Sequence, residues 1–230
     1  MFATVPFPVG EWLQSKRDWI NLKHHWLPHD WLTRIDIAAP RDIGEGAEVF
    51  TVVNLRDMRS SRDSEINRQD KSILAEFWKL LGVTPQSAVH WTSVYENFAS
   101  PVIFMLKDKF NRARPYHYLP QQVAATFQPG WPAYPSGHST QSFLLAHAFS
   151  PCFPDRELDL FALAERISIN REIAGVHFGT DSLAGAELAR QLYQEILLES
   201  PKYLESAAFA CKGLRDLYFS KGIADQESIA

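Results

Sequence analysis

The sequence has little cysteine, no long apolar run and no basic N-terminal leader. Its longest nearly apolar stretch, residues 98–106, is about half of the ~20 residues that a membrane-spanning helix needs. The first residues lack both the basic start and the continuous apolar core of a secretion signal. For a complete chain we therefore expect a cytoplasmic protein that does not span a bilayer.

The scarcity of cysteine also limits covalent and metal chemistry. The two cysteines, Cys152 and Cys211, cannot form a disulfide framework, and their separation fits no metal-site spacing. We expect both to be reduced thiols in the core. The neighbouring His24, His25 and His29 have no cysteine or carboxylate partner at ligand spacing, so we predict no metal site.

The composition is typical of a packed globular protein. Hydrophobic residues make up 46% of the 230 residues and charged residues 22%, which excludes disorder and fibrous order. No repeat, low-complexity stretch or Gly/Ser linker divides the chain, so we predict one domain over residues 1–230. The net charge of −4 argues against a nucleic-acid partner.

Helical periodicity runs through most of the chain and predicts an all-α, single-domain helical bundle. An irregular segment with one short strand at 49–53 is expected over residues 34–67. Gly82 is a helix stop, and Thr84-Pro85 opens a new helix with an N-cap and an N1 proline. Further ranges complete the prediction: helices at 70–81, 85–100, 102–110, 137–149, 156–175, 181–199 and 202–218, and a flexible polar tail at 220–230.

Three tryptophans recur every seven residues near the N-terminus, at Trp12, Trp19 and Trp26. This spacing predicts one apolar stripe on one helix, which ends at Pro28. The stripe would pack against the domain or a second subunit, which allows a homo-oligomer. Interleaved basic residues also allow peripheral contact with a membrane surface.

Lys107 and Arg114-Pro115 form the first of three motifs that carry chemistry. A continuous helix would place the two cations on one face, about 10 Å apart. Pro115 disfavours helix at Arg114, which is expected to fold back from the helix end. Both cations can then converge on one anion, although a solvated helix end would show the same run of charges.

The second motif, Pro135-Ser136-Gly137-His138, opens an apolar helix. Backbone N–H groups at Ser136 and Gly137 would face an anion at the helix N-terminus, with His138 beside it.

The third motif is Arg171, His177 and Asp181. Arg171 and His177 can reach one point only if Gly175 breaks the helix between them. Asp181 can then reach a His177 ring nitrogen and fix its tautomer.

In this order the three motifs resemble the type 2 phosphatidic acid phosphatase superfamily, which includes class A acid phosphatases and vanadium haloperoxidases. The family pattern Lys-x6-Arg-Pro, Pro-Ser-Gly-His, Ser-Arg-x5-His-x3-Asp is matched within residues 107–185, with Asn170 in place of the serine. The resemblance implies the all-α fold of that family, and no motif is recognisable in the first hundred residues.

The resemblance also implies a metal-independent phosphatase that needs no cofactor. Because the chain lacks the spanning helices of membrane-embedded relatives, we expect a soluble protein that takes a small phosphomonoester or diphosphate. His177 would be the nucleophile that forms a phosphohistidine, oriented by Asp181, and His138 the general acid and base. The expected phosphate-binding residues are Lys107, Arg114, Ser136, Gly137 and Arg171.

Two other functions fit the same residues. In a vanadium haloperoxidase the anion site would hold vanadate as cofactor with His177 as its axial ligand, but such proteins are typically much larger. A non-catalytic anion-binding protein is the third alternative.

Residues around the motifs receive lesser roles. His117, Trp131 and Tyr134 are placed to line the pocket mouth. His90 and His147 are expected to be packed structural residues, whereas Asp108 and Arg112 are expected to be surface charges.

Overall fold

The computed structural model describes residues 5–21, 28, 30–40, 47–83, 91, 94 and 98–227. Within these ranges the regular elements are helices, and the β-type pairing is a single bridge between Pro6 and Arg112. This confirms the predicted all-α class. None of the described helices is long and apolar enough to cross a membrane.

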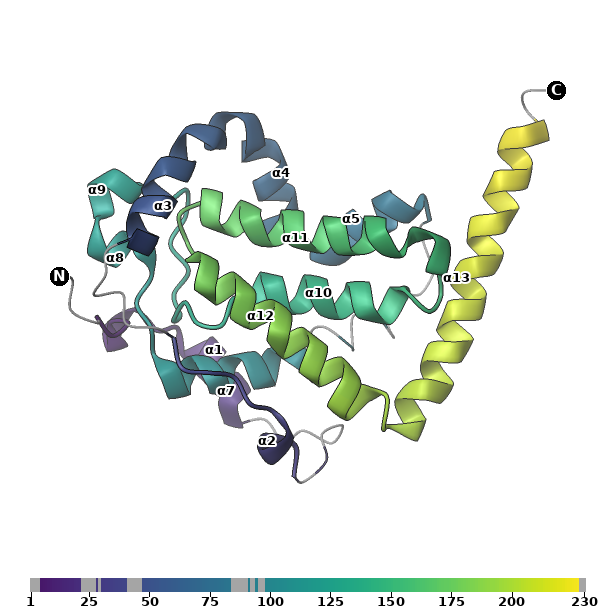
Figure 1. Cartoon of the computed structure of the whole chain (residues 1–230), viewed down its shortest axis with the longest axis horizontal. Coiled ribbons are helices and arrows are strands. Elements are labelled where there is room, and N and C mark those ends of the chain that lie inside the picture. Colours follow the sequence, from purple (N-terminus) through teal and green to yellow (C-terminus); the bar gives the residue numbers. More distant parts are fainter. Residues whose placement is uncertain are drawn as a thin grey trace.

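Three helices form the centre of the molecule: α10 (Gly137–Phe149), α11 (Glu157–Ile173) and α12 (Gly179–Gln191). They lie side by side (Figure 1), and α12 continues into a π-helical segment at Leu192–Leu197. A Cβ on Gly185 of α12 would lie only 2.6 Å from the Ser136 carbonyl oxygen. This contact between backbones brings the start of α10 directly against α12.

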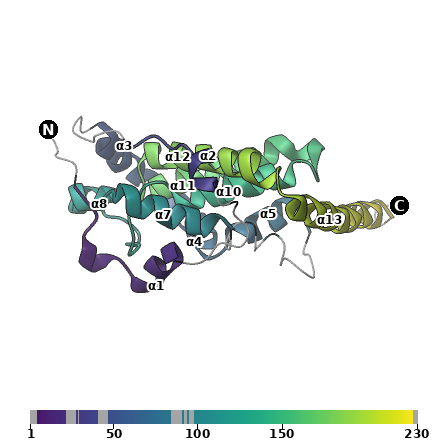
Figure 2. The same cartoon turned by 90° about the horizontal axis from the view of Figure 1, so that it is seen from below.

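Other helices surround this centre. α4 (Arg59–Lys71) and α5 (Ile73–Leu81) pack on α11, while α7 (Ser100–Phe110) packs on α10. The long α13 (Pro201–Glu227) crosses one end of the bundle and extends beyond it, as Figures 1 and 2 show. Short helices complete the fold: α1 (Gln14–Arg17), α2 (Trp31–Arg34), α3 (Ala47–Leu55), α8 (Pro115–Tyr118) and α9 (Pro120–Val123).

The predictions for α10 to α13 and α5 agree closely with the structure, but two others were wrong. Residues 34–67 were expected to be irregular with a strand at 49–53, yet α3 and most of α4 occupy this range. Few apolar residues mark α4, because it buries little besides Ile66. The valines of α3 have the β-branched side chains that favour a strand. The tail predicted at 220–230 is helical to Glu227. Most of the helix predicted at 85–100 lies outside the described residues.

The N-terminal tryptophan stripe does not lie on one helix. Trp12 has an extended backbone between a 3₁₀ turn at Val9–Glu11 and α1, and its side chain is buried. A second 3₁₀ turn follows α1 at Asp18–Asn21. The side chain of Trp19 and all of Trp26 lie outside the described residues. Trp12 therefore packs on the body of the protein, and it is not part of an exposed stripe.

The expectation of two reduced cysteines was also wrong, because Cys152 and Cys211 form a disulfide. Their Cα atoms lie 5.1 Å apart although 59 residues separate them in sequence. The pair joins the segment after α10 to α13, at a contact that sequence spacing alone cannot reveal. Cys152 belongs to the core cluster that also contains Phe149, Phe153 and Leu214, and the partly buried Cys211 packs against it.

Gly175 ends the helical path after α11, as the motif spacing predicted. Its φ of +80° lies in the left-handed region, and its N–H donates to the Glu172 carbonyl oxygen at 2.9 Å. A Cβ at this position would lie 2.6 Å from Arg59 Nη2 and 2.9 Å from Val123 Cγ1. Both the backbone conformation and the close packing therefore require glycine.

We expect Gly175→Ala to lower the free energy of unfolding by about 2–4 kcal/mol, since left-handed strain adds to overpacking. Gly82→Ala is the matched control: φ is +65° there, but the added Cβ would meet nothing within 4 Å. That control should lose only about 1–2 kcal/mol. Urea unfolding followed by circular dichroism compares the two variants, and an equal loss in both would contradict the packing argument.

Candidate active site

The three motifs meet at one place in the fold. Lys107 lies on the last turn of α7, Ser136 caps the start of α10, and His177 lies in the short connection between α11 and α12. The backbone N–H of Ser136 was expected to face an anion, but it donates to the Asp181 carbonyl oxygen at 2.9 Å. This hydrogen bond ties the second motif directly to the third.

His177 and Asp181 form a buried pair at the start of α12. Nδ1 of His177 lies 3.1 Å from Asp181 Oδ2, and the Phe178 N–H donates to the same oxygen at 2.9 Å. A carboxylate accepts hydrogen bonds, so the proton of a neutral His177 resides on Nδ1. Nε2 is therefore the unprotonated nitrogen, and it lies 3.3 Å from Nη1 of Arg114.

Arg112 is the second partner of Asp181, and its expected role as a surface charge was wrong. Its side chain is only 1% exposed and donates through Nη1 to Asp181 Oδ1 and, at 2.8 Å, to Thr180 Oγ1. Nη2 binds Glu48 Oε2 on α3 at 2.9 Å. A buried carboxylate needs a counter-ion, but nothing in the local sequence pairs Arg112 with the distant Asp181.

Arg114 extends from the N-cap of α8, where its backbone is extended as the following proline requires. It is fully buried and donates to three backbone carbonyl oxygens: Trp131 at 2.9 Å, Val176 at 2.7 Å and Pro132 at 3.3 Å. Burial is the main reason that its pKa falls to about 10. It remains a cation at neutral pH and is held rigidly beside His177.

Lys107 is buried, and its ammonium group binds the turn before α10. Nζ donates to the carbonyl oxygens of Pro132, Ala133 and Pro135 at 2.8, 2.7 and 2.6 Å. Burial, followed by the charge of Arg114, lowers the pKa of Lys107 well below its usual value. The Lys107 ammonium thus fixes the Pro-Ser-Gly-His turn.

Asp70, at the end of α4, is a site residue that the sequence did not identify. Its Oδ1 lies 3.0 Å from Arg171 Nη2 and 3.6 Å from His138 Nε2. One carboxylate oxygen thus faces both the third cation and the second histidine. Asp70 has no motif around it, and only the packing of α4 on α11 brings it to the site.

Asn170, the departure from the family pattern, helps to attach α4. It is fully buried, its Nδ2 donates to Gln69 Oε1 at 2.8 Å, and its Oδ1 accepts from Arg62 Nη1 at 3.2 Å. The residue before Arg171 therefore anchors the helix that carries Asp70.

Arg171 has buried hydrogen-bonding groups without a protein acceptor. Its side chain is 3% exposed, and within the described part of the chain Nε and Nη1 have no hydrogen-bond partner. The guanidinium lies 4.6 Å from the centre of the Phe127 ring, and its pKa falls to about 10 because of burial. Two unsatisfied donors on a buried cation are what an anion site presents before the anion binds.

Both histidines are held in the uncharged form. Burial is the largest cause that lowers the pKa of His138 and of His177 well below the usual value. The next largest cause is the charge of Arg171 for His138 and the charge of Arg114 for His177. At neutral pH each imidazole therefore has one unprotonated ring nitrogen.

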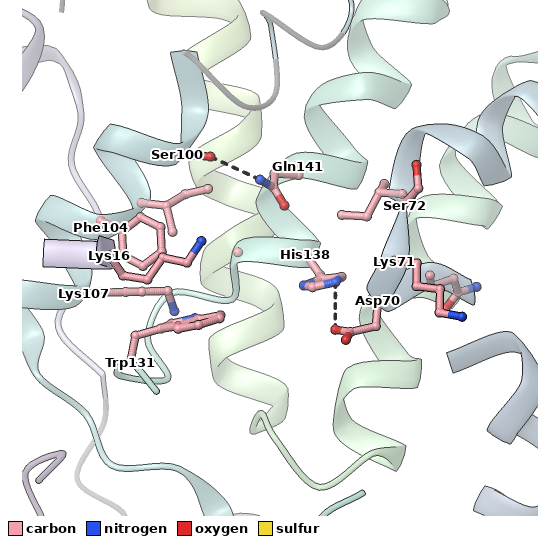
Figure 3. A pocket seen from close by; sticks show the side chains of 14 residues that line it. Lys16, Asp70, Lys71, Ser72, Ser100, Phe104, Lys107, Trp131, His138 and Gln141 are labelled. Carbon is pink, nitrogen blue, oxygen red and sulfur yellow. Dashed lines mark hydrogen bonds and ion pairs between the residues drawn. The ribbon is translucent and has the colours of Figure 1, made fainter. Parts of the chain in front are cut away.

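A pocket of about 380 Å³ opens beside His138. Figure 3 shows His138 between two groups of labelled residues: Lys16, Phe104, Lys107 and Trp131 on one side, and Asp70, Lys71 and Ser72 on the other.

Of the three residues expected at the mouth, Trp131 lines this pocket. Tyr134 instead donates to the Ala38 carbonyl oxygen at 2.6 Å, and His117 accepts from the Arg114 N–H at 3.0 Å. The structural role expected for His147 agrees with its stacking on Tyr193, whereas His90 lies outside the described residues.

The comparisons with known proteins agree with the geometry. A search among curated proteins finds no match to the chain. The family model of the PAP2 superfamily matches residues 91–192, a segment that contains all three motifs. This match supports membership of the PAP2 superfamily, and such membership implies a phosphatase-type activity.

Proposed function

We propose that this protein hydrolyses a small phosphomonoester or diphosphate through a phosphohistidine on His177, without a metal ion. The observation that carries the proposal is the buried Arg171, whose Nε and Nη1 have no acceptor among the described residues and lie beside two uncharged histidines. A phosphoryl group offers oxygens that satisfy such donors. It also offers a phosphorus atom that an imidazole nitrogen can attack.

His177 is suited to the nucleophilic step. Its Nδ1–H is held by Asp181, so the unprotonated Nε2 can form a bond to phosphorus while the bond to the leaving oxygen breaks. Arg114 Nη1, 3.3 Å from Nε2, would donate to a phosphoryl oxygen as negative charge develops there. Asp181 also stabilises the positive charge that the imidazole acquires.

His138 is suited to proton transfer. In the first step it would give a proton to the leaving oxygen; in the second it would take a proton from the water that attacks phosphorus and breaks the P–N bond. A bound phosphate dianion favours a charged imidazole, so substrate binding itself raises the pKa of His138 and supplies the acid. Asp70 would hold this imidazole in place.

The groups in the site favour an anion over a metal ion. Lys107, Arg114 and Arg171 are cations, and Asp181 is neutralised by Arg112. Among the described residues, no group of three or more histidines, cysteines and carboxylates could hold a metal ion. Charge stabilisation by three fixed cations is the chemistry that phosphoryl transfer requires.

We expect Arg171→Ala to weaken competitive inhibition by vanadate and to raise KM, because one cation of a desolvated anion site is lost. Such losses are typically about 2–5 kcal/mol. Arg171→Lys keeps the charge but loses the planar set of donors. Its KM and its inhibition by vanadate should therefore lie between those of the unaltered protein and those of Arg171→Ala. Arg190→Ala, a surface arginine paired with Glu187, is the control. Phosphate release with and without vanadate and a chelator measures these effects. Abolition by the chelator would contradict the metal-free proposal.

The two histidines should leave different traces when removed. His177→Ala should form no phosphoenzyme, because the proposed nucleophile is gone. His138→Ala should still be phosphorylated by p-nitrophenyl phosphate, whose leaving group departs without a proton, but water attack should be slow. A base-stable, acid-labile phosphohistidine should therefore accumulate in His138→Ala.

Rapid quenching and mass spectrometry locate the phosphate in these variants. Phosphate on His138 or Ser136 would contradict the assignment of His177. With no covalent intermediate in any variant, direct water attack would replace the proposed mechanism. Bromide peroxidation with added vanadate then tests for a haloperoxidase.

The histidine pKa values give a pH-dependent expectation. In the free protein both His138 and His177 should titrate below about 6.5, because burial and nearby cations disfavour the imidazolium. Saturating phosphate should raise the pKa of His138, since the anion offsets the cations. Nitrogen NMR of the unaltered protein, assigned with single His→Ala variants, follows both. A His138 that titrates above 6.5 without phosphate would contradict this electrostatic account.

A further inference from the structure

The active-site pocket contains a fourth cation that belongs to none of the three motifs. Lys16 of α1 lines the pocket together with Lys107, Trp131 and His138, and it lies far outside the segment that matches the family model. We propose that Lys16 binds a second phosphate on the leaving group, so that the preferred substrates are organic diphosphates. This inference rests on the proposed phosphatase function.

Lys16 is held at the pocket by the docking of the N-terminal segment. The Phe7 N–H donates to the Asn111 carbonyl oxygen, and the Leu13 N–H donates to that of Gly130, each at 2.9 Å. A side chain on Gly130 would collide with Leu13, which shows how closely the two segments approach. The start of α1 is therefore fixed next to Trp131.

Two aromatic rings position the Lys16 ammonium. Nζ lies 5.4 Å from the centre of the Trp131 ring and 5.9 Å from that of Phe104. Such cation–π contacts hold the cation without neutralising its charge. Within the described part of the chain, Lys16 Nζ has no hydrogen bond or ion pair. By contrast, Lys107 Nζ already donates to three carbonyl oxygens.

Trp131 connects this outer cation to the inner ones. The Arg114 guanidinium carbon lies 6.0 Å from the centre of the same ring, and Arg114 Nε donates to the Trp131 carbonyl oxygen. Arg114 and Lys16 thus both contact one indole, the first beside His177 and the second at the pocket wall. A phosphoryl group at His177 would contact Arg114, and a second phosphate on the leaving group would contact Lys16.

The remaining pocket fits an organic group beyond the second phosphate. Its volume of about 380 Å³ exceeds the space of one phosphoryl group, and Ile73, Ile103 and Phe104 add apolar surface to the wall. The other outer lysine, Lys71, is exposed, and its amino group points away from His138 (Figure 3). Lys16 is therefore the residue that we assign to the second phosphate.

The test compares benzyl diphosphate with benzyl phosphate in Lys16→Met and Arg17→Met. Both variants remove one cation from α1, but Arg17 stacks on Trp12 and does not line the pocket. For Lys16→Met we expect kcat/KM for the diphosphate to fall about ten- to a hundredfold, the effect of one charge-assisted hydrogen bond. The loss with the monophosphate should be much smaller, and Arg17→Met should not change the ratio of the two substrates.

Equal losses on both substrates in Lys16→Met, or no loss on either, would overturn the proposal. A binding measurement separates it from the phosphatase function itself. By calorimetry, methylenediphosphonate should bind more tightly than orthophosphate to the unaltered protein, and Lys16→Met should abolish this difference. If this preference is found but neither ester is hydrolysed, only the proposed activity fails. If the esters are hydrolysed without the preference, the role of Lys16 fails.

Discussion

The buried Asp181 carboxylate holds the catalytic region together. Its two oxygens accept from Arg112, His177 and the Phe178 N–H, and its backbone carbonyl oxygen accepts from the Ser136 N–H. One residue thus joins the segment after α7, the start of α10 and the start of α12. An unpaired carboxylate at this depth would be strongly destabilising. The fold is therefore stable only when these segments meet in this arrangement.

The pairing at Asp181 neutralises Arg112 but leaves an excess of positive charge around it. Arg114 and Arg171 are buried, and burial lowers the pKa of each to about 10. Arg114 has carbonyl oxygens as acceptors, which carry no full negative charge, and Arg171 has a ring face and one ion pair with the partly exposed Asp70. An anion bound in this region would therefore offset the free energy that burial of these two cations costs. Burial, together with this positive field, keeps His138 and His177 uncharged.

Local motifs made most of this site predictable. Lys107, His138 and His177 lie in short patterns whose spacing has a direct geometric meaning, and the structure brings these patterns together. Arg112 and Asp70 could not be found in this way, because the groups that they contact lie far along the chain.

The same distinction applies to the fold. The apolar α5 and α10 to α12 were evident from their periodicity. The polar α4 was not, because its helical state depends on packing against α11 and on few apolar residues of its own. The disulfide between Cys152 and Cys211 likewise depends on a contact between distant segments.

The three carbonyl oxygens around Lys107 Nζ have the arrangement of a coordination shell, with an ammonium group in the place of an inorganic ion. A lysine used in this way is a cation that cannot dissociate or be exchanged, because its own helix tethers it. The turn before α10 is therefore shaped independently of the ionic content of the solution. The turn is therefore already ordered in the folded protein, and the binding of the proposed phosphorylated substrate would not have to order it.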